Sequence, residues 1–468
     1  MLTVSEYDVI VVGGGSAGAV AAIAAARNGA STLLIERYGF LGGAITGQYI
    51  IGLKSFFNTR GEQIVGGIPQ EIVDRVVRLG GSLGHIRDRF WVACGSTTPL
   101  DPATLKYVLD EMAAEAGVKL LFHTFAINTV VSKNTVRGVE ITNKSGRQIV
   151  LGKVIIDATG DGDIAAWAGA PYEKGGKDGR MMQVSLIVRV GNVQKDKLIS
   201  YIKENPDDFI IGEDPYSGLT RELVVSRLRD FSEAPEIGGF FRLVRKAVEK
   251  GEMHPFSPRG GVNILISPMK EEAYVYGTNI VDIDGTNAWD LSRAEVELRK
   301  QAFILVGFLR KYIPGFEESY LIDVAPQVGI RETRRIIGEY VLTAEDVIEG
   351  RKFNDVVAKG SNPVDLHSPE DPRKIIHKFV KGGGSYDIPY RCLIPKGIDN
   401  LLVAGRCISA THEGMASART AVTCMATGQA AGTAAALSVK EGVTPRRLDV
   451  SKLQKTLHEQ GVILYGVH

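Results

Sequence analysis

The sequence predicts an α/β protein in which a discontinuous Rossmann-like nucleotide-binding domain carries an inserted α+β domain. Near the N-terminus, the aliphatic run VIVV (9–12) leads into the glycine turn GGGSAG and then into an alanine-rich stretch. This order is typical of a strand, a tight turn and a helix. Residues from about 175 to 385 have a different sequence pattern, in which charged helical segments alternate with β-rich segments. A short aliphatic run, NLLVAG, then precedes a long stretch of small residues.

We therefore expect three regions along the chain. The first domain spans 1–175 and 386–445, and the inserted substrate or cap domain spans 176–385. A C-terminal helix and tail occupy 446–468. A chain of 468 residues is long for one compact core, which favours this division.

The composition is that of an ordinary globular protein. The hydrophobic fraction is 44% and the formal net charge is +1, which gives no general electrostatic reason to bind nucleic acid or an anionic membrane. We therefore expect neither as a partner. The four cysteines form no C-x-x-C pair, so no metal site and no redox-active disulfide are indicated.

Two uncharged segments, 9–26 and 420–439, require comparison with membrane spans. The first is interrupted by glycines and has no basic leader. The second contains Gly428-x-x-x-Gly432, the spacing of membrane helix dimers, but its Thr, Gln and Gly residues make it too weakly apolar. We expect a buried helix packed on a sheet, no membrane span and, without an export signal, a cytoplasmic location.

The elements of the first domain follow from local signals. Strand 8–12, helix 17–28 and strand 32–36 form a βαβ unit with short connections. A further amphipathic helix begins at Asp101 or Thr104, either of which can cap it, and ends at Gly117. A strand begins at Val118, and the β segments TVRGVEIT and RQIVLGKVIIDATG form a hairpin through 144–146.

Gly13-x-Gly15-x-x-Gly18 is the fingerprint of a dinucleotide site. The first glycine permits the turn, the second admits a pyrophosphate, and the third lets the helix pack on the strand. Glu36, at the end of the next strand, can accept hydrogen bonds from ribose hydroxyls. Gly42 and Gly43 allow a second close backbone approach, which favours FAD over NAD.

A second pattern, Gly160-x-Gly162-x-x-Ala165, imitates this fingerprint. Its Asp161 and Asp163 would repel phosphate, and Gly169 follows too soon for a long helix. We therefore expect no separate NAD(P) domain.

Several motifs in order resemble those of a known family: VIVVGGGSAG, LLIERYGFLGGA, LDPATLKYVLDEM, VIIDATGDGDIAAWAGAP, VGIRETRRIIGEYVLT and YDIPYRCLIPKGIDNLLVAGRCISATHEGMASART. Together they are similar to the FAD-dependent oxidoreductase family of the glutathione-reductase-type flavoprotein superfamily, from about residue 6 to 440. The resemblance implies a discontinuous Rossmann-like FAD-binding domain and an inserted α+β substrate domain.

The resemblance also implies positions that contact FAD. The glycines at 13, 15 and 18 hold the pyrophosphate, Glu36 the ribose, and Ala126 the adenine, while the helix starting at 415–417 points its N-terminus at the flavin pyrimidine. The expected contacts are Gly13, Gly15, Ser16, Ala17, Gly18, Glu36, Arg37, Gly42, Gly43, Ala44, Ala126, Thr159, Gly160, Asp161, Gly405, Arg406, Met415, Ala416 and Ser417.

His412 is the first candidate for the chemistry, because it lies just before the helix expected to abut the flavin. It can act as a base or bind a substrate anion. The neighbouring Glu413 either orients it or faces solvent. The alternative is a structural histidine. If their segment is helical, Arg331 and Arg334 share a helix face and can clamp a carboxylate or phosphate. The alternative is a structural ion pair through Glu332.

Three further side chains lie in the same motifs. Tyr386 and Tyr390 either line the cleft or pack in the core. Cys407 invites a redox role, but it has no partner cysteine in sequence reach. Covalent attachment of FAD through His412 or Cys407 is left open.

These residues predict a dehydrogenase or reductase that moves a hydride between a small organic substrate and the flavin N5. The electron donor or acceptor is a quinone, a protein carrier or a second substrate. One alternative is a flavin-dependent RNA-modifying enzyme, against which the near-neutral charge argues. Another is a flavin subunit of an electron-transfer complex, although no Fe–S cysteine run supports it. A non-catalytic FAD-binding protein is the third. Self-association into a homo-oligomer is left open.

Overall fold

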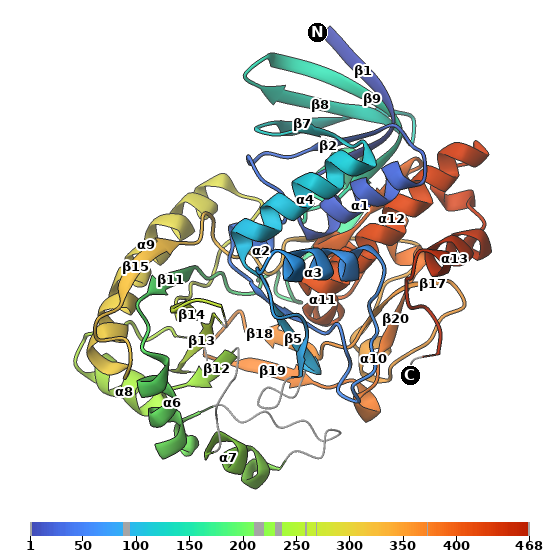
Figure 1. The fold of residues 1–468 in the computed structure, drawn as a ribbon. Coiled ribbons are helices and arrows are strands. Elements are labelled where there is room, and N and C mark those ends of the chain that lie inside the picture. Colours follow the sequence, from blue (N-terminus) through green and yellow to red (C-terminus); the bar gives the residue numbers. More distant parts are fainter. Residues whose placement is uncertain are drawn as a thin grey trace.

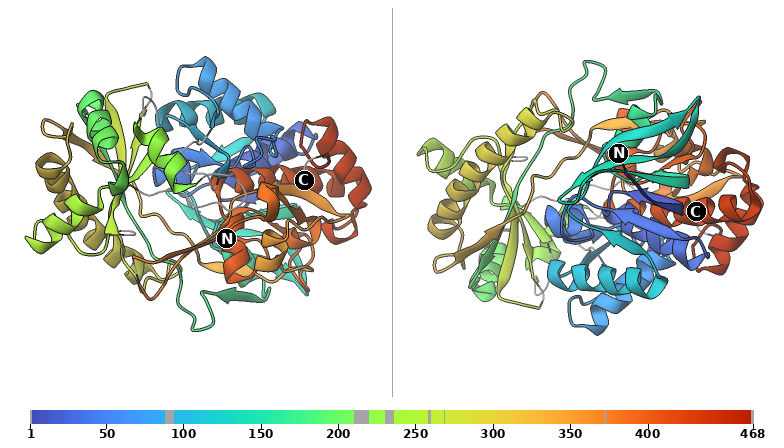
Figure 2. Two further views of the ribbon diagram at one scale, coloured as in Figure 1. Left: turned by 90° about the horizontal axis from the view of Figure 1, so that it is seen from below. Right: turned by 90° about the horizontal axis from the view of Figure 1, so that it is seen from above.

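The computed structural model describes residues 2–87, 94–209, 220–229, 236–257, 260–267, 269–371 and 373–466. It shows a mixed α/β protein with two buried hydrophobic cores, one around a largely parallel sheet and one around an antiparallel sheet (Figure 1). In Figure 2, the green and yellow part of the chain lies on one side and the blue and red part on the other.

The first sheet has seven strands in the order β6-β2-β1-β9-β8-β7, with β21 also paired to β9. Strands β6, β2, β1, β9 and β21 are parallel, and β9, β8 and β7 form an antiparallel meander. The strand bounds are β1 Leu2–Val12, β2 Thr32–Ile35, β6 Lys119–Leu121, β7 Phe125–Ser132, β8 Thr135–Asn143, β9 Gly146–Asp157 and β21 Leu401–Val403.

Helix α1 (Ser16–Arg27) packs between α12 (Ala421–Glu441) and α4 (Pro102–Ala116). Nearly all of α12 is buried, and its spacing of small residues lets two helix backbones touch: a Cβ at Gly432 would lie 2.8 Å from the carbonyl carbon of Ala21. The expectation of a buried helix in segment 420–439 is confirmed. In the described part of the chain, no helix is long and apolar enough to cross a membrane.

The local predictions for the first domain are confirmed. The side chain of Asp101 caps α4 by accepting from the N–H of Thr104 (2.9 Å), and Gly117 ends the helix in the left-handed conformation. The hairpin β8–β9 turns at 144–145, and the 17–28 helix begins one residue earlier, at Ser16.

The second sheet is antiparallel, in the order β12-β13-β14-β11-β15. The long helix α9 (Ala288–Tyr312) packs its buried side on this sheet. The other elements are β11 Ile187–Gly191, β12 Glu236–Gly239, β13 Val262–Ile266, β14 Glu272–Tyr276, β15 Tyr320–Val324, α6 Lys195–Glu204, α7 Arg221–Arg229 and α8 Phe241–Glu249.

The second core extends along the chain from Val184 to Ile330 and also takes Tyr49 and Ile51. Buried apolar residues between 336 and 380, a stretch assigned from the sequence to the inserted domain, pack in the first core. There, β17 (Val356–Gly360) pairs with β20 (Tyr386–Pro389), and β17 contacts α12 and α13 (Val450–Glu459). The division into domains stays a prediction.

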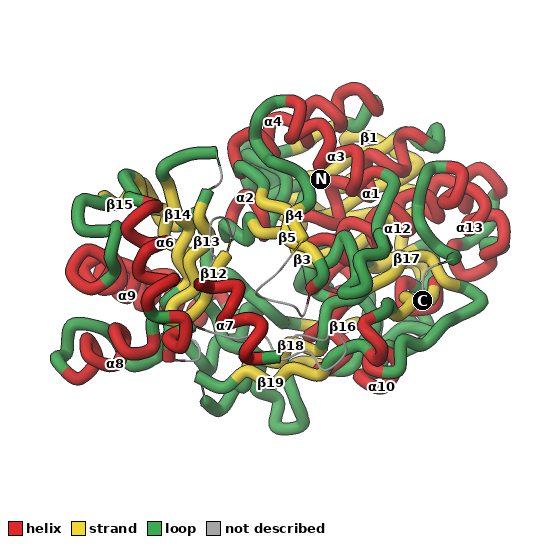
Figure 3. Tube along the Cα trace, turned by 60° about the horizontal axis from the view of Figure 1, so that its bottom comes forward, coloured by secondary structure: helices red, strands yellow, loops and turns green. Residues whose placement is uncertain are grey.

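Smaller elements connect the two sheets. In Figures 1 and 3, the hairpin β18–β19 lies between the five-stranded sheet and helix α10 (Ala344–Ile348). The remaining bounds are α2 Ala44–Gly47, β3 Gly52–Lys54, α3 Ile68–Arg78, β4 Ile86–Arg87, β5 Ser96–Pro99, α5 Asp163–Trp167, β10 Tyr172–Lys174, β16 Arg334–Ile336, α10 Ala344–Ile348, β17 Val356–Gly360, β18 Val364–His367, β19 Ile375–Lys378, β20 Tyr386–Pro389, α11 His412–Ala418 and α13 Val450–Glu459.

Candidate active site

A cavity of about 330 Å³ lies at the carboxyl ends of the parallel strands β1, β2, β9 and β21. Open α/β sheets bind ligands at this edge, because the strand-to-helix turns place backbone and side chains there. Of the residues predicted from the sequence, those that line the cavity are Gly13, Gly15, Ser16, Ala17, Glu36, Arg37, Gly43, Ala44, Ala126, Thr159, Gly160, Arg331, Gly405 and Arg406.

The turn between β1 and α1 presents backbone N–H groups to the cavity. No side chain caps this end of α1, and its first turn holds no acidic residue. A helix N-terminus of this kind favours an anion. Beside it, Gly15 leaves open space, because the nearest atom to a Cβ there would be Gly43 Cα at 3.9 Å. A Cβ at Gly13 would lie 2.5 Å from the carbonyl oxygen of Ala158. The turn therefore fits the pyrophosphate of a dinucleotide.

Glu36 lies at the end of β2 with its carboxylate against this turn. Its oxygens accept from the N–H groups of Gly14 (2.6 Å) and Tyr38 (2.8 Å). Burial raises the pKa of the Glu36 carboxyl. A carboxylate has about four acceptor positions, so two are left for the hydroxyl groups of a ribose.

One end of the cavity has a partly aromatic wall. Phe125 and Ala126 at the start of β7 face it, together with Trp167 at the end of α5. The guanidinium of Arg37 lies 5.0 Å from the ring centroid of Tyr38. Flat apolar surfaces beside a cation suit a purine ring, so the adenine fits this end.

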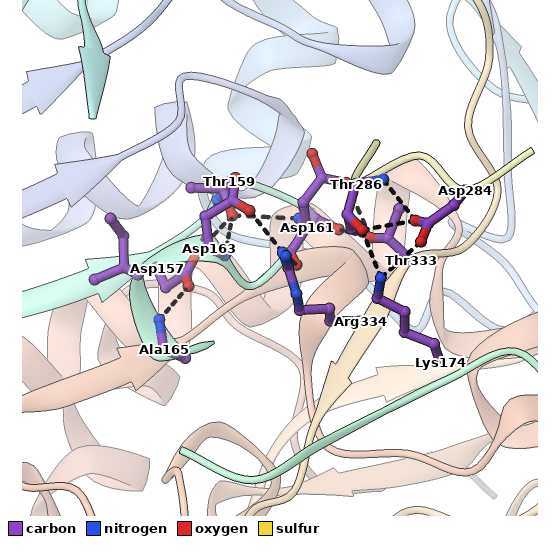
Figure 4. A network of polar contacts seen from close by, with 12 residues as sticks. Asp157, Thr159, Asp161, Asp163, Ala165, Lys174, Asp284, Thr286, Thr333 and Arg334 are labelled. Atoms are coloured by element: carbon purple, nitrogen blue, oxygen red, sulfur yellow. Dashed lines mark hydrogen bonds and ion pairs between the residues drawn. The ribbon is translucent and has the colours of Figure 1, made fainter. Parts of the chain in front are cut away.

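The segment after β9 is held by a polar network (Figure 4). Asp157 accepts from the hydroxyl of Thr159 (2.7 Å), and burial raises the pKa of Asp157 to about 6. Asp161 accepts from Thr333 Oγ1 (2.9 Å) and from Arg406 Nη2 (2.7 Å). Because Arg406 compensates the charge of Asp161, that carboxylate no longer prevents a phosphate from approaching Gly160.

The far end of the cavity is reached by a different helix terminus from the one expected. Met415, Ala416 and Ser417 are buried in α11 and do not line the cavity. The chain contains two N-caps in succession, Thr411 for α11 and Thr420 for α12, so the long helix starts later than the sequence suggested. Thr420 and Ala421 line the cavity instead.

His412 does not line the cavity. Its Nδ1 is 2.8 Å from Glu332 Oε1, and Glu332 also pairs with the buried Arg335. The sequence proposed the neighbouring Glu413 as the orienting group, whereas Glu332 occupies that position. A Cβ at Gly176 would lie 3.7 Å from His412 Nε2, so the second nitrogen lies close to Gly176. The geometry supports the structural alternative, and a catalytic role stays a prediction.

The expected Arg331–Arg334 clamp is not formed. The segment is extended, and Arg334 begins strand β16, so the two side chains do not share a helix face. Arg334 donates to Asp163 (2.7 Å) and lies off the cavity, whereas Arg331 lines it. The pairing of Tyr172 to Lys174 with β16 competes successfully with helix formation here.

Other predicted residues act in packing. Gly18 lies under the turn, where a Cβ would be 3.0 Å from the Cβ of Ala158. Gly42 has a φ of +101° and donates its N–H to the carbonyl of Gly14 (2.9 Å). Tyr386 and Tyr390 are buried in the core, which agrees with the second of the two alternatives, core packing. Cys407 is fully buried, and burial raises the pKa of its thiol well above the usual value.

Sequence reasoning missed most of the far end of the cavity. A cap-type threonine before the small-residue run is a signal that could have identified Thr420. The others come from segments distant in the chain and carry no local motif. The missed lining residues there are Gln48, Ile50, Gly52, Leu53, Lys54, Ser185, Gln327, Gly329, Ile330, Arg419, Thr420, Ala421 and Cys424.

Comparison with known proteins gives a family over most of the chain and relatives over parts of it. Residues 8–457 match the model of the family described as FAD dependent oxidoreductase. Over 168 residues the chain is 26% identical to digeranylgeranylglycerophospholipid reductase 1 of Methanococcoides burtonii, covering 35% of this chain and 40% of that protein. Over 85 residues it is 41% identical to the tRNA uridine 5-carboxymethylaminomethyl modification enzyme of Treponema pallidum, covering 18% and 11%.

The chain thus spans less than half the length of these curated relatives. Among solved structures, a geranylgeranyl bacteriochlorophyll reductase-like protein from Thermoplasma acidophilum aligns over 97% of this chain and 84% of its own, at 15% identity and a TM-score of 0.45. Because the family match extends over nearly the whole chain, the protein belongs to the FAD-dependent oxidoreductase family, and its cofactor is FAD.

Proposed function

We propose that the protein moves a hydride between a small organic substrate and bound FAD, with a separate electron donor or acceptor. The observation that carries the proposal is the extent of the cavity. It runs from the α1 turn and Glu36 to residues such as Lys54, Ser185 and Gln327, which lie outside the nucleotide-binding motifs. A cavity of this kind can hold a flavin ring and a substrate side by side.

The chain's own groups have separate tasks in this proposal. The N-terminus of α1 binds the pyrophosphate, and Glu36 binds the adenosine ribose. At the other end, α12 starts at the cavity with no acidic residue in its first turn. Its positive terminus stabilises negative charge on a reduced flavin. FAD, when bound, supplies a site at N5 that gives or takes a hydride.

The substrate side of the cavity has a mixed wall. Ile50 and Ile330 are apolar, and they adjoin Ser185, Gln327 and Arg331. Such walls bind small molecules by burying apolar surface and orienting them with a few polar groups. We propose that the antiparallel sheet and its helices form the substrate domain inserted into the FAD-binding domain.

The electron partner is proposed to be a quinone, a protein carrier or a second substrate. At the second glycine pattern, α5 has only five residues and its Asp163 pairs with Arg334. This arrangement does not offer the long helix terminus that a second dinucleotide uses. Membership of the glutathione-reductase-type superfamily, a cytoplasmic location and self-association are further proposals from the sequence.

Rapid mixing under anaerobic conditions tests the hydride transfer. The oxidised holoenzyme is mixed with candidate alcohols, amines and saturated acids, and the reduced holoenzyme with the corresponding carbonyl and unsaturated compounds. We expect one pair to bleach or restore the long-wavelength flavin band, with slower bleaching when the transferred hydrogen is deuterium. Bleaching by dithionite alone, with every organic compound inert in both directions, would contradict the proposal. A salt-sensitive gel shift of tRNA would favour the RNA-modifying alternative instead.

A further inference from the structure

Two arginines from separate segments line the far end of the cavity. Arg331 follows Gly329 and Ile330 in the wall, and Arg419 ends α11 directly before the start of α12. Their charges affect each other: burial and then the nearby Arg419 lower the pKa of Arg331 to about 10. The two guanidinium groups therefore share one region of the cavity wall.

The two arginines share a single carboxylate. Arg419 Nη2 donates to Asp365 Oδ2 (3.1 Å), and its buried Nε has no partner among the described residues. Arg331 donates from Nη1 to the neutral carbonyl oxygen of Gln183 (2.8 Å) and forms no ion pair within the described ranges. Positive charge at this wall thus exceeds negative charge.

Asp365 has little capacity left to compensate a second guanidinium. Besides Arg419, it contacts His377 Nε2 (2.8 Å) and His367 Nε2 (3.4 Å) from the same hairpin, β18–β19. Burial and the nearby Arg331 lower the pKa of His367 to about 3, so this imidazole is neutral at pH 7. The two guanidinium groups and this one carboxylate together leave one positive charge.

An unpaired charge at a buried wall costs free energy unless a ligand compensates it. Lys54, whose ammonium group also lies at this end, is compensated by Glu236 (2.8 Å). The start of α12 adds a partial positive charge beside Arg419. A monoanion satisfies this balance, and a planar carboxylate matches the fork of a guanidinium. A phosphate dianion carries more charge than the two guanidinium groups and Asp365 leave uncompensated.

We propose that Arg331 and Arg419 together bind a carboxylate group of the substrate at the flavin end of the cavity. This proposal rests on the proposed function in one respect: the bound acid is the substrate only if the protein transfers a hydride to or from it. It makes the substrate class an organic acid, held by its carboxylate while another carbon lies against the flavin. Arg331 and Arg419 are binding residues in this proposal and do not exchange the proton of the reaction.

The test uses oxidised holoenzyme and needs no turnover. Acetate, propionate and benzoate are titrated alongside acetamide, propionamide and benzamide, and alongside inorganic phosphate. Binding is measured by the change in the long-wavelength flavin band and, independently, by equilibrium dialysis of labelled benzoate. We expect saturable binding of the carboxylates and none of the amides. Arg331→Gln and Arg419→Gln should each weaken carboxylate binding by about 10- to 100-fold, because each removes charge-assisted hydrogen bonds that contribute this much to the affinity.

Two further variants separate binding from folding. Arg331→Lys keeps the charge and loses the fork, so we expect an intermediate affinity for carboxylate in a protein that retains FAD. Arg391→Gln is the matched control, because Arg391 pairs with Asp355 and does not line the cavity. This variant should bind carboxylates like the unaltered protein.

Four results would overturn the proposal: no carboxylate binds, the amides bind as tightly, both glutamine variants retain the full affinity, or phosphate binds more tightly than every carboxylate. A shift of the flavin midpoint potential in the arginine variants without any loss of carboxylate affinity would assign the pair to the flavin and also overturn it. Failure of the proposed function looks different, since carboxylates would bind while no substrate bleached the flavin.

Discussion

Gly432→Ala tests the contact between α12 and α1, which positions the dinucleotide turn. The added Cβ would lie 2.8 Å from the carbonyl carbon of Ala21 and 2.9 Å from the Cβ of Ala24, where ordinary contacts are 3.4–4 Å. The helices must therefore separate by more than about half an ångström, because the obstruction is backbone and cannot rotate away.

Overpacking of this kind costs about 1–3 kcal/mol, and replacing glycine by alanine within a helix returns about 0.5–1 kcal/mol. We expect Gly432→Ala to lower the free energy of unfolding by roughly 1–2 kcal/mol. FAD should also bind more weakly, since the N-terminus of α1 moves with the helix. The assays are urea unfolding followed by circular dichroism and FAD titration followed by quenching of flavin fluorescence.

Gly307→Ala in α9 is the matched control. Gly307 is exposed, and a Cβ there would meet nothing within 4 Å. We expect the control to be about 0.5–1 kcal/mol more stable than the unaltered protein, through helix propensity alone, with unchanged FAD affinity. If Gly432→Ala were as stable as Gly307→Ala and bound FAD equally well, the argument from close helix packing would be refuted.

Four further substitutions test the nucleotide turn and the buried carboxylates. Glu36→Gln should weaken FAD binding by about 10-fold, since an amide offers one acceptor oxygen where the carboxylate offers two, as flavin fluorescence titration will show. Burial raises the pKa of Asp157 from 3.8 to about 6, so the folded state keeps a proton that the unfolded state loses. The free energy of unfolding should therefore fall as pH rises from about 4 to 6, and urea titrations should show a smaller fall for Asp157→Asn. Glu332→Gln leaves the buried Arg335 with only the exposed Glu173 as a charged partner (3.3 Å) and should cost about 3 kcal/mol, whereas His412→Gln should cost about 1–2 kcal/mol. Equal losses in urea unfolding would contradict the central position of Glu332.

The nucleotide half of the cavity could be predicted because its chemistry is local. Gly13 and Gly15 lie in the turn that they specify, and Glu36 follows the next strand of the same βαβ unit. The cap Asp101 and the terminator Gly117 act within one helix. In each case, neighbouring residues determine the conformation, so their order along the chain is enough.

The substrate half depends on contacts between distant residues. Arg419 and Asp365 are 54 positions apart, and Arg331 and Gln183 are 148 apart. His412 meets Glu332 across 80 positions, although the sequence offered the adjacent Glu413. The prediction of an Arg331–Arg334 pair was wrong because strand pairing with β10 overrode the helical spacing. A single sequence contains no signal for such pairs.

The absorbance spectrum of the purified protein, before and after acid precipitation, tests the central claim most directly. We expect a flavin spectrum that passes entirely into the supernatant as FAD, with one equivalent per chain. This would agree with the burial of Cys407 and the placement of His412 away from the cavity. A yellow pellet would contradict this description of the two side chains. A colourless protein that FAD cannot reconstitute would contradict the assignment of the cavity itself.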